Sequence, residues 1–256
     1  LKSTGTPISF TLSKRQLPKN IPDDWQVETI ENGSFKITVT ETMEVYLPDT
    51  VEPKVSSAGQ LPTGFDASTL YNSRNHPKGV QLTVFGASDA LHSVGIEWKQ
   101  LMSKIQPDQI SVYAGSAVGQ MDDFGGRGMM QSWHKGGRIS SKQLPLMLTQ
   151  MPADFINGYI INSVGTTGTN MGACATFLYN LRQGIHDIQS GRSRIVIVGS
   201  AEAGVEPEII EGFRAMGALS EDAQIAKLDQ TEIPDLTKSC RPFSDNAGFT
   251  IGESSE

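Results

Sequence analysis

The sequence predicts an α/β protein in which helices are layered around a mixed or parallel sheet. Strand-like and helical patterns alternate from about residue 110 to residue 217, and this alternation is typical of parallel strands joined by helices. The chain has 256 residues and is 38% hydrophobic, which is enough for one large domain or two modest ones. Composition divides it into residues 1–60 and 61–256.

Residues 1–60 are rich in Thr, Pro, Lys and Glu. A short stretch, 35–40, alternates polar and apolar residues as a half-buried strand does. We interpret this segment as an N-terminal extension or insertion, and the sequence assigns no role to it.

Hydrophobic spacing gives the elements after residue 61. Steps of three and four residues predict an amphipathic helix that ends near Gly95, carrying Leu82, Phe85, Ala90, Leu91 and Val94. Residues 109–115 fit a strand that runs into a glycine loop, and 144–156 return to helical spacing. Residues 195–199 are again strand-like.

Cys174 lies between small residues where an extended run turns into a helix. The first N–H groups of a helix lack partners within the helix and carry the positive end of its dipole, so this position favours a thiolate. The helix that follows is predicted to bury an apolar face made of Phe177, Leu178, Leu181, Ile185 and Ile188.

Four segments in order, residues 164–176, 190–202, 212–220 and 241–253, resemble the β-ketoacyl-ACP synthases, the condensing enzymes of the thiolase superfamily. The residues at 244–247 and 254–255 depart from the common pattern, as in a divergent bacterial type. The resemblance implies a thiolase-like fold, with residues 61–256 as the N-terminal half of a pseudo-duplicated core.

The resemblance also implies a reaction. Cys174 would take an acyl chain from the phosphopantetheine of an acyl carrier protein and then undergo decarboxylative Claisen condensation with malonyl-ACP, in fatty acid or polyketide synthesis. No further cofactor is implied. The family forms homodimers through the strand before the nucleophile, so residues 168–172 are the expected two-fold seam.

Other residues acquire roles only through this resemblance. Ala117 and Val118 would form the floor of an acyl pocket, which in the family dimer belongs to the partner subunit, and Phe213 would lie beside the acyl channel. The alternatives are a glycine turn for the loop and core packing for Phe213. Three basic residues align with positions that contact the acidic carrier, namely Arg74, Lys78 and Arg214.

The histidines and lysine that support decarboxylation in the family are not found here. None of the four histidines, His76, His92, His134 and His186, lies in a family motif. His186 follows Cys174 by 12 residues, about 18 Å along one helix, which is too far to share a proton with the sulfur. We therefore expect the missing residues beyond Glu256, and this chain to be part of a longer protein.

Two other kinds of protein fit the cysteine turn. One is a CoA-dependent enzyme, either thiolase-like or similar to ketoacyl-ACP synthase III. The other is a non-catalytic ketosynthase-like partner subunit, although the presence of Cys174 argues against it.

Composition excludes several partners. The formal net charge of −7 argues against nucleic acid, and no apolar run approaches the length of a membrane span. Two cysteines are too few for a disulfide scaffold, which favours the cytoplasm, and Cys240 is interpreted as structural. No cluster of residues has the spacing of a zinc site.

Overall fold

The chain folds as two units, residues 1–53 and 54–256. The computed structural model describes residues 2–3, 8–30, 33–40, 46–47, 52–73 and 75–256. The first unit carries five strands among its described residues: β1 (Lys2–Ser3), β2 (Ser9–Ser13), β3 (Trp25–Ile30), β4 (Ser34–Val39) and β5 (Tyr46–Leu47).

The first unit is built on an antiparallel sheet in the order β2-β4-β3, and β1 pairs with β5 separately. Ile37 and Val39 are buried, and the rings of Phe10 and Trp25 meet edge to face at 5.3 Å. The central strand β4 confirms the strand predicted at residues 35–40.

The second unit holds the helices and a second sheet. Its strands are β6 (Ile110–Gly115), β7 (Thr167–Gly168), β8 (Ile195–Ala203) and β9 (Glu253–Ser255). Its α-helices are α1 (Lys78–Ser93), α2 (Trp98–Met102), α3 (Gly126–Gln131), α4 (Gln143–Leu146), α5 (Met151–Ile156), α6 (Thr176–Gln189), α7 (Pro207–Ala215) and α8 (Asp222–Leu228). Short 3-10 turns occur at Ala67–Thr69, Pro107–Gln109, Ala173–Ala175 and Leu236–Lys238, and a π-helical turn at Asn157–Ile161. Within the described residues, no helix combines the length and the apolar character needed to cross a bilayer.

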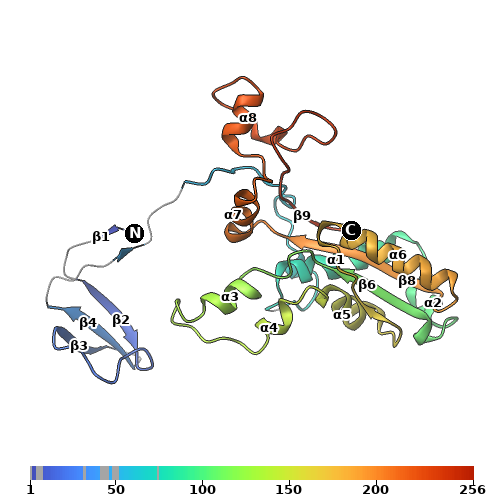
Figure 1. Cartoon of the computed structure of the whole chain (residues 1–256). Coiled ribbons are helices and arrows are strands. Elements are labelled where there is room, and N and C mark those ends of the chain that lie inside the picture. Colours follow the sequence, from blue (N-terminus) through green and yellow to red (C-terminus); the bar gives the residue numbers. More distant parts are fainter. Residues whose placement is uncertain (1, 4–7, 31–32, 41–45, 48–51, 74) are drawn as a thin grey trace. The chain divides into compact units, whose positions relative to one another are not determined.

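The sheet of the second unit has the order β7-β6-β8-β9. The first three strands are parallel, and β9 runs antiparallel to β8 (Figure 1). Strand β6 and helix α1 lie where the sequence predicted them, and α1 ends just before Gly95, whose φ is +71°. The predicted strand at 195–199 continues to Ala203 because its later residues pair with β9.

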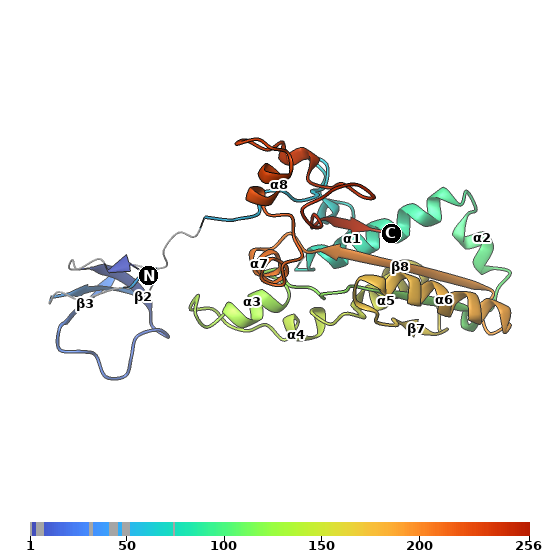
Figure 2. The ribbon, with the colours of Figure 1, turned by 45° about the horizontal axis from the view of Figure 1, so that its top comes forward.

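Helices lie against the sheet of the second unit (Figures 1 and 2), and the side chains of β6 alternate between its two faces. Ile110 and Val112 pack with Ala87 of α1 and with Ala153 and Ile156 of α5. The intervening side chains of β6 point to the opposite face, where the Tyr113 hydroxyl donates a hydrogen bond to Asp187 of α6. Helices α1 and α5 therefore cover one face of the sheet, and α6 covers the other.

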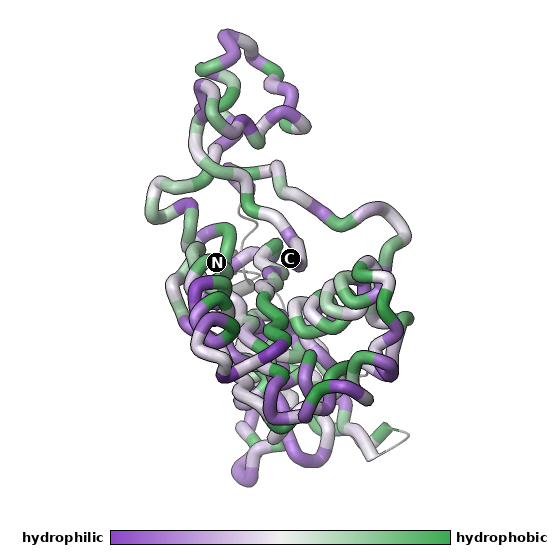
Figure 3. The backbone as a smooth tube through the Cα atoms, turned by 90° about the vertical axis from the view of Figure 1, so that its right-hand side faces the viewer, coloured by the Kyte–Doolittle hydropathy of each residue, from purple (hydrophilic) through white to green (hydrophobic). Residues whose placement is uncertain are grey.

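Helix α6 does not bury the apolar face that its sequence predicts. Leu178 is 63% exposed and Ile185 is 49% exposed, and Leu181 and Ile188 are exposed too. The buried residues are instead Thr176, Asn180, Gly184 and Asp187. A Cβ at Gly184 would lie 3.0 Å from the Cγ1 atoms of Val196 and Val198, so the small residue lets the helix approach β8 closely. The hydrophobic stretches along the helices can be followed in Figure 3.

The helical pattern predicted for residues 144–156 is broken in two. Helix α4 ends at Leu146 and α5 begins at Met151, with Pro152 in its first turn. Proline has no N–H to continue a preceding helix but suits the first turn of a new one. Residues 125–138, which precede α4, are rich in glycine but include the helix α3.

The Tyr113–Asp187 contact gives a test of how α6 is attached. Replacing Tyr113 with Phe removes a 2.6 Å hydrogen bond to a fully buried carboxyl group, and we expect the free energy of unfolding to fall by about 1–3 kcal/mol. Urea denaturation measures this. Tyr179→Phe is the matched control, since the Tyr179 hydroxyl has no hydrogen-bond partner among the described residues, and its effect is expected within about 0.5 kcal/mol.

The effect of Tyr113→Phe should depend on pH. Burial opposes ionisation of Asp187, but hydrogen bonds from Tyr113 and Gln183 and the charge of Arg192 hold its pKa below the ordinary value. A lowered pKa in the folded state stabilises the fold above the unfolded pKa of about 3.9, and this contribution is lost as the pH falls through the folded value. An equal loss of stability at pH 7 and pH 3 would contradict this assignment.

Candidate active site

Cys174 lies in a turn between the edge strand of the sheet and the start of α6. It is the central residue of the 3-10 turn Ala173–Ala175, which leads directly into α6. Ala173 has a φ of +49°, which is uncommon for a residue with a Cβ. Such strain persists only where neighbouring contacts enforce it.

Two buried side chains of α6 hold this turn. The Thr176 hydroxyl accepts a hydrogen bond from the Gly172 N–H at 3.1 Å and donates one to the Ala173 carbonyl at 2.7 Å. The Asn180 carbonyl oxygen accepts the Asn170 N–H at 2.7 Å, and its amide lies 3.1 Å from the Thr169 hydroxyl. These bonds secure the backbone on the N-terminal side of the cysteine.

The cysteine opens onto a cavity of about 280 Å³. Cys174 itself is exposed and forms no disulfide within the described residues. The structure brings it together with all three residues proposed for the acyl pocket, Ala117, Val118 and Phe213, which line the same cavity of the same chain. The remaining lining residues are Ala173, Thr176, Ser200, Glu202, Gly204, Ile209, Phe249, Thr250, Ile251, Gly252, Ser254 and Glu256.

Phe213 packs against a hydrophobic core cluster and also lines the cavity. It packs against the small core of Val55, Leu219 and Ile251, and its ring meets that of Phe249 edge to face at 5.3 Å. The channel and core interpretations of this residue are therefore compatible, because Phe213 packs against the core and also lines the cavity.

Glu202 is the cavity residue that sequence reasoning did not single out. Its carboxylate accepts hydrogen bonds from the Ala117 N–H and, at 3.0 Å, from the Ser116 hydroxyl. Burial raises the pKa of Glu202, although these bonds partly oppose the rise. The available signal was a charged residue near the end of a strand that begins with the apolar run Ile195–Val198, but its partners lie more than 80 residues earlier.

The three residues predicted to dock a carrier are not equivalent. Arg74 lies outside the described residues. Lys78 pairs with Glu253 at 2.5 Å and its side chain remains 45% exposed. Arg214 donates to Glu211 and lies 3.4 Å from Glu221, so it is already paired on two sides.

None of the four histidines lines the Cys174 cavity. The side chain of His186 is 69% exposed, as expected for a solvated residue. His76 lies between the hydroxyls of Tyr71 and Tyr159, and burial, followed by the charge of Lys142, lowers its pKa.

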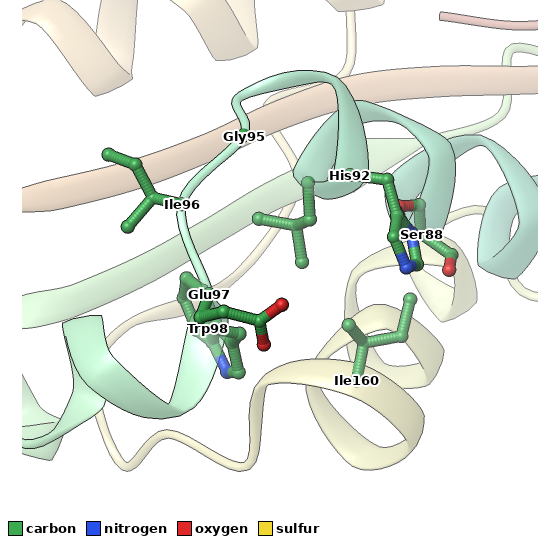
Figure 4. A pocket seen from close by; sticks show the side chains of 8 residues that line it. Ser88, His92, Gly95, Ile96, Glu97, Trp98 and Ile160 are labelled. Atoms are coloured by element: carbon green, nitrogen blue, oxygen red, sulfur yellow. Dashed lines mark hydrogen bonds between the residues drawn. The ribbon is translucent and has the colours of Figure 1, made fainter.

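His92 belongs to a separate cavity of about 270 Å³ at the C-terminal end of α1. There Glu97 and Trp98 lie across from Ser88 and Ile160 (Figure 4). The lining holds no cysteine. Within the part of the chain that the structure describes, no group of three or more His, Cys, Asp or Glu residues is arranged to hold a metal ion. Cys240, interpreted as structural, is exposed.

Known proteins resemble this chain over most of its length. The chain is 47% identical over 252 residues to the β-ketoacyl-[acyl-carrier-protein] synthase FabY of Pseudomonas aeruginosa, covering 98% of this chain and 40% of that protein. A crystal structure of the FabY ketosynthase matches 99% of the chain with a TM-score of 0.85. The chain therefore spans about 40% of the length of this relative.

More distant matches include a second acyl-carrier-protein synthase and a ketosynthase of the same fold. The 3-oxoacyl-[acyl-carrier-protein] synthase 2 of Staphylococcus aureus is 27% identical over 228 residues, covering 87% of this chain and half of that protein. A type II polyketide ketosynthase, solved in complex with its acyl-carrier protein, shares the fold at 21% identity with a TM-score of 0.56, over 79% of this chain and 45% of that one. The expected thiolase-like ketosynthase fold is thus confirmed.

The family model for the N-terminal domain of β-ketoacyl synthases matches residues 22–255. The match begins inside the segment 1–60, for which the sequence alone offered no counterpart. Since it spans most of the chain and agrees with the FabY similarity, this chain belongs to the β-ketoacyl synthase family and carries its N-terminal domain.

Proposed function

We propose that Cys174 is the nucleophile of a β-ketoacyl-ACP synthase that extends acyl chains in fatty acid or polyketide synthesis. The observation that carries this proposal is the shared cavity, in which an exposed cysteine at a helix start meets apolar walls from three separate segments. Two relatives are named β-ketoacyl-[acyl-carrier-protein] synthase and 3-oxoacyl-[acyl-carrier-protein] synthase 2, and these names support the same activity.

The reaction proposed for this site has two steps. The Cys174 thiolate attacks the thioester carbonyl of an acyl carrier protein and expels the phosphopantetheine thiolate, which takes a proton from water, leaving the acyl group on the sulfur of Cys174. Malonyl-ACP then loses carbon dioxide, and its carbanion attacks the acyl carbonyl and releases the Cys174 thiolate. The N–H of Cys174 would form one arm of the oxyanion hole. The residues that support decarboxylation are proposed to lie in the part of the protein that this chain does not span.

A homodimer is the proposed assembly. Strand β7 lies at an edge of the four-stranded sheet, and an edge strand presents unpaired backbone groups that a second copy can pair. The segment 168–172 that follows is the proposed seam, and Met171 within it is exposed. The two free cysteines support a cytoplasmic location.

Acylation of Cys174 is the direct test of this function. We expect intact-protein mass spectrometry of the full-length protein, incubated with an acyl-ACP, to show one acyl adduct. Cys240→Ala is the matched control, because it removes the other exposed thiol, and it should keep the adduct. Cys174→Ala should lose it. An adduct that survives in Cys174→Ala, or disappears in Cys240→Ala, would refute the assignment.

Carrier docking is proposed for Arg74, Lys78 and Arg214. Replacing all three with Ala is expected to weaken affinity for the acyl carrier protein several-fold at low salt, and less as salt screens the charges. Fluorescence anisotropy with labelled carrier measures this. The control variant Lys99→Ala, Lys104→Ala, Arg194→Ala removes three exposed positive charges elsewhere. Equal affinity in both triple variants at low salt would remove the proposal.

A further inference from the structure

The backbone alternation of β8 sends Glu202 into the Cys174 cavity. Val196 and Val198 face Gly184 of α6, whereas Ala201 and Ala203 pack with Leu82 on the other side of the sheet. Residues two apart on a strand share a face. Ser200 and Glu202 therefore lie on the α6 face, beside the turn that carries the cysteine, and both line the cavity.

The Glu202 carboxylate ties down the loop 115–119. One oxygen accepts the Ala117 N–H and the other accepts the Ser116 hydroxyl. The same hydroxyl oxygen accepts the Gly119 N–H at 3.0 Å, and Ser116 is 1% exposed. One carboxylate thus fixes the loop at its middle and, through Ser116, at its end.

Keeping this carboxylate here is costly. Burial raises the pKa of Glu202, and no Lys or Arg forms an ion pair with it within the described residues. Its hydrogen-bond donors are neutral. An apolar residue would suit this half-buried strand position, which lines the cavity with Ile209 and Phe213, because even partial burial of an unpaired charge is unfavourable. The cost points to a function at the cavity rather than to stability of the sheet.

We propose that Glu202 is a specificity-determining residue, whose carboxylate holds the loop 115–119 as a wall of the cavity and so limits the length of the acyl chain that Cys174 accepts. This inference rests on the proposed function of Cys174. Ala117 and Val118 lie in the wall itself, and Glu202 fixes them without touching the reacting atoms.

Two substitutions separate the effect of the hydrogen bonds that hold the loop 115–119 from the effect of the negative charge on Glu202. Glu202→Gln keeps the volume and an oxygen that can accept the Ala117 N–H, so it should retain the native length preference. Glu202→Ala frees the loop and opens space, so it should accept longer chains. Each additional methylene buried is worth about fourfold in affinity. The shift is expected mainly in KM, because the reacting atoms are unchanged.

The experiment measures acylation of Cys174 in the full-length protein across acyl-phosphopantetheine thioesters of increasing length. Glu232→Ala, an exposed carboxylate outside the cavity, is the control and should match the wild type. Hydrogen–deuterium exchange of residues 115–119 supplies a readout independent of activity. The Ala117 amide should exchange about tenfold faster in Glu202→Ala, as expected when its hydrogen-bond acceptor is lost, and near the native rate in Glu202→Gln, which keeps an acceptor oxygen.

The outcomes distinguish the two proposals. A wild-type protein that is not acylated at Cys174 refutes the proposed function, and this specificity role with it. Acylation with an unchanged length preference in Glu202→Ala refutes the specificity role alone. Unchanged hydrogen–deuterium exchange of the Ala117 amide in Glu202→Ala refutes the claim that the Glu202 carboxylate holds the loop. If the chain-length preference shifts as far in Glu202→Gln as in Glu202→Ala, the effect belongs to the charge of Glu202, and the claim that its hydrogen bonds hold the loop is refuted. If Glu202→Ala does not fold, Ser116→Ala removes the second contact and should shift the preference in the same direction.

Discussion

The hydrogen bonds between the turn before Cys174 and the side chains of Thr176 and Asn180 are the interactions on which the site depends. They hold a backbone that includes Ala173 at a positive φ. Both side chains are buried, so the bonds form away from competing water. Helix α6 thus uses its polar face to shape the turn that precedes it, and the exposed sulfur of Cys174 reaches the cavity.

Strand β8 links this turn to the rest of the cavity. One side of the strand builds the core with α1 and α5, and the other approaches α6 and supplies Ser200 and Glu202 to the cavity. Gly184 permits the close approach. The position of the cavity wall relative to Cys174 therefore follows from sheet register, and the loop 115–119 is adjusted to it by hydrogen bonding.

Local patterns predicted what depends on neighbours in sequence. The strand at 110–115, the helix ending before Gly95 and the cysteine at a helix start all follow from short-range spacing. The buried face of α6 was predicted wrongly, because Asn180 and Asp187 are buried by partners on other segments. Glu202 was missed for the same reason. The break between α4 and α5 was signalled by Pro152, but helical spacing across it outweighed that signal.

A crystal structure of the full-length protein, determined after reaction with an acyl thioester, tests the central claim most directly. The account predicts an acyl carbonyl bonded to the sulfur of Cys174, with its chain in the cavity between Phe213 and the loop that Glu202 holds. An acyl group on another residue, or a chain that leaves Cys174 away from this cavity, would contradict it.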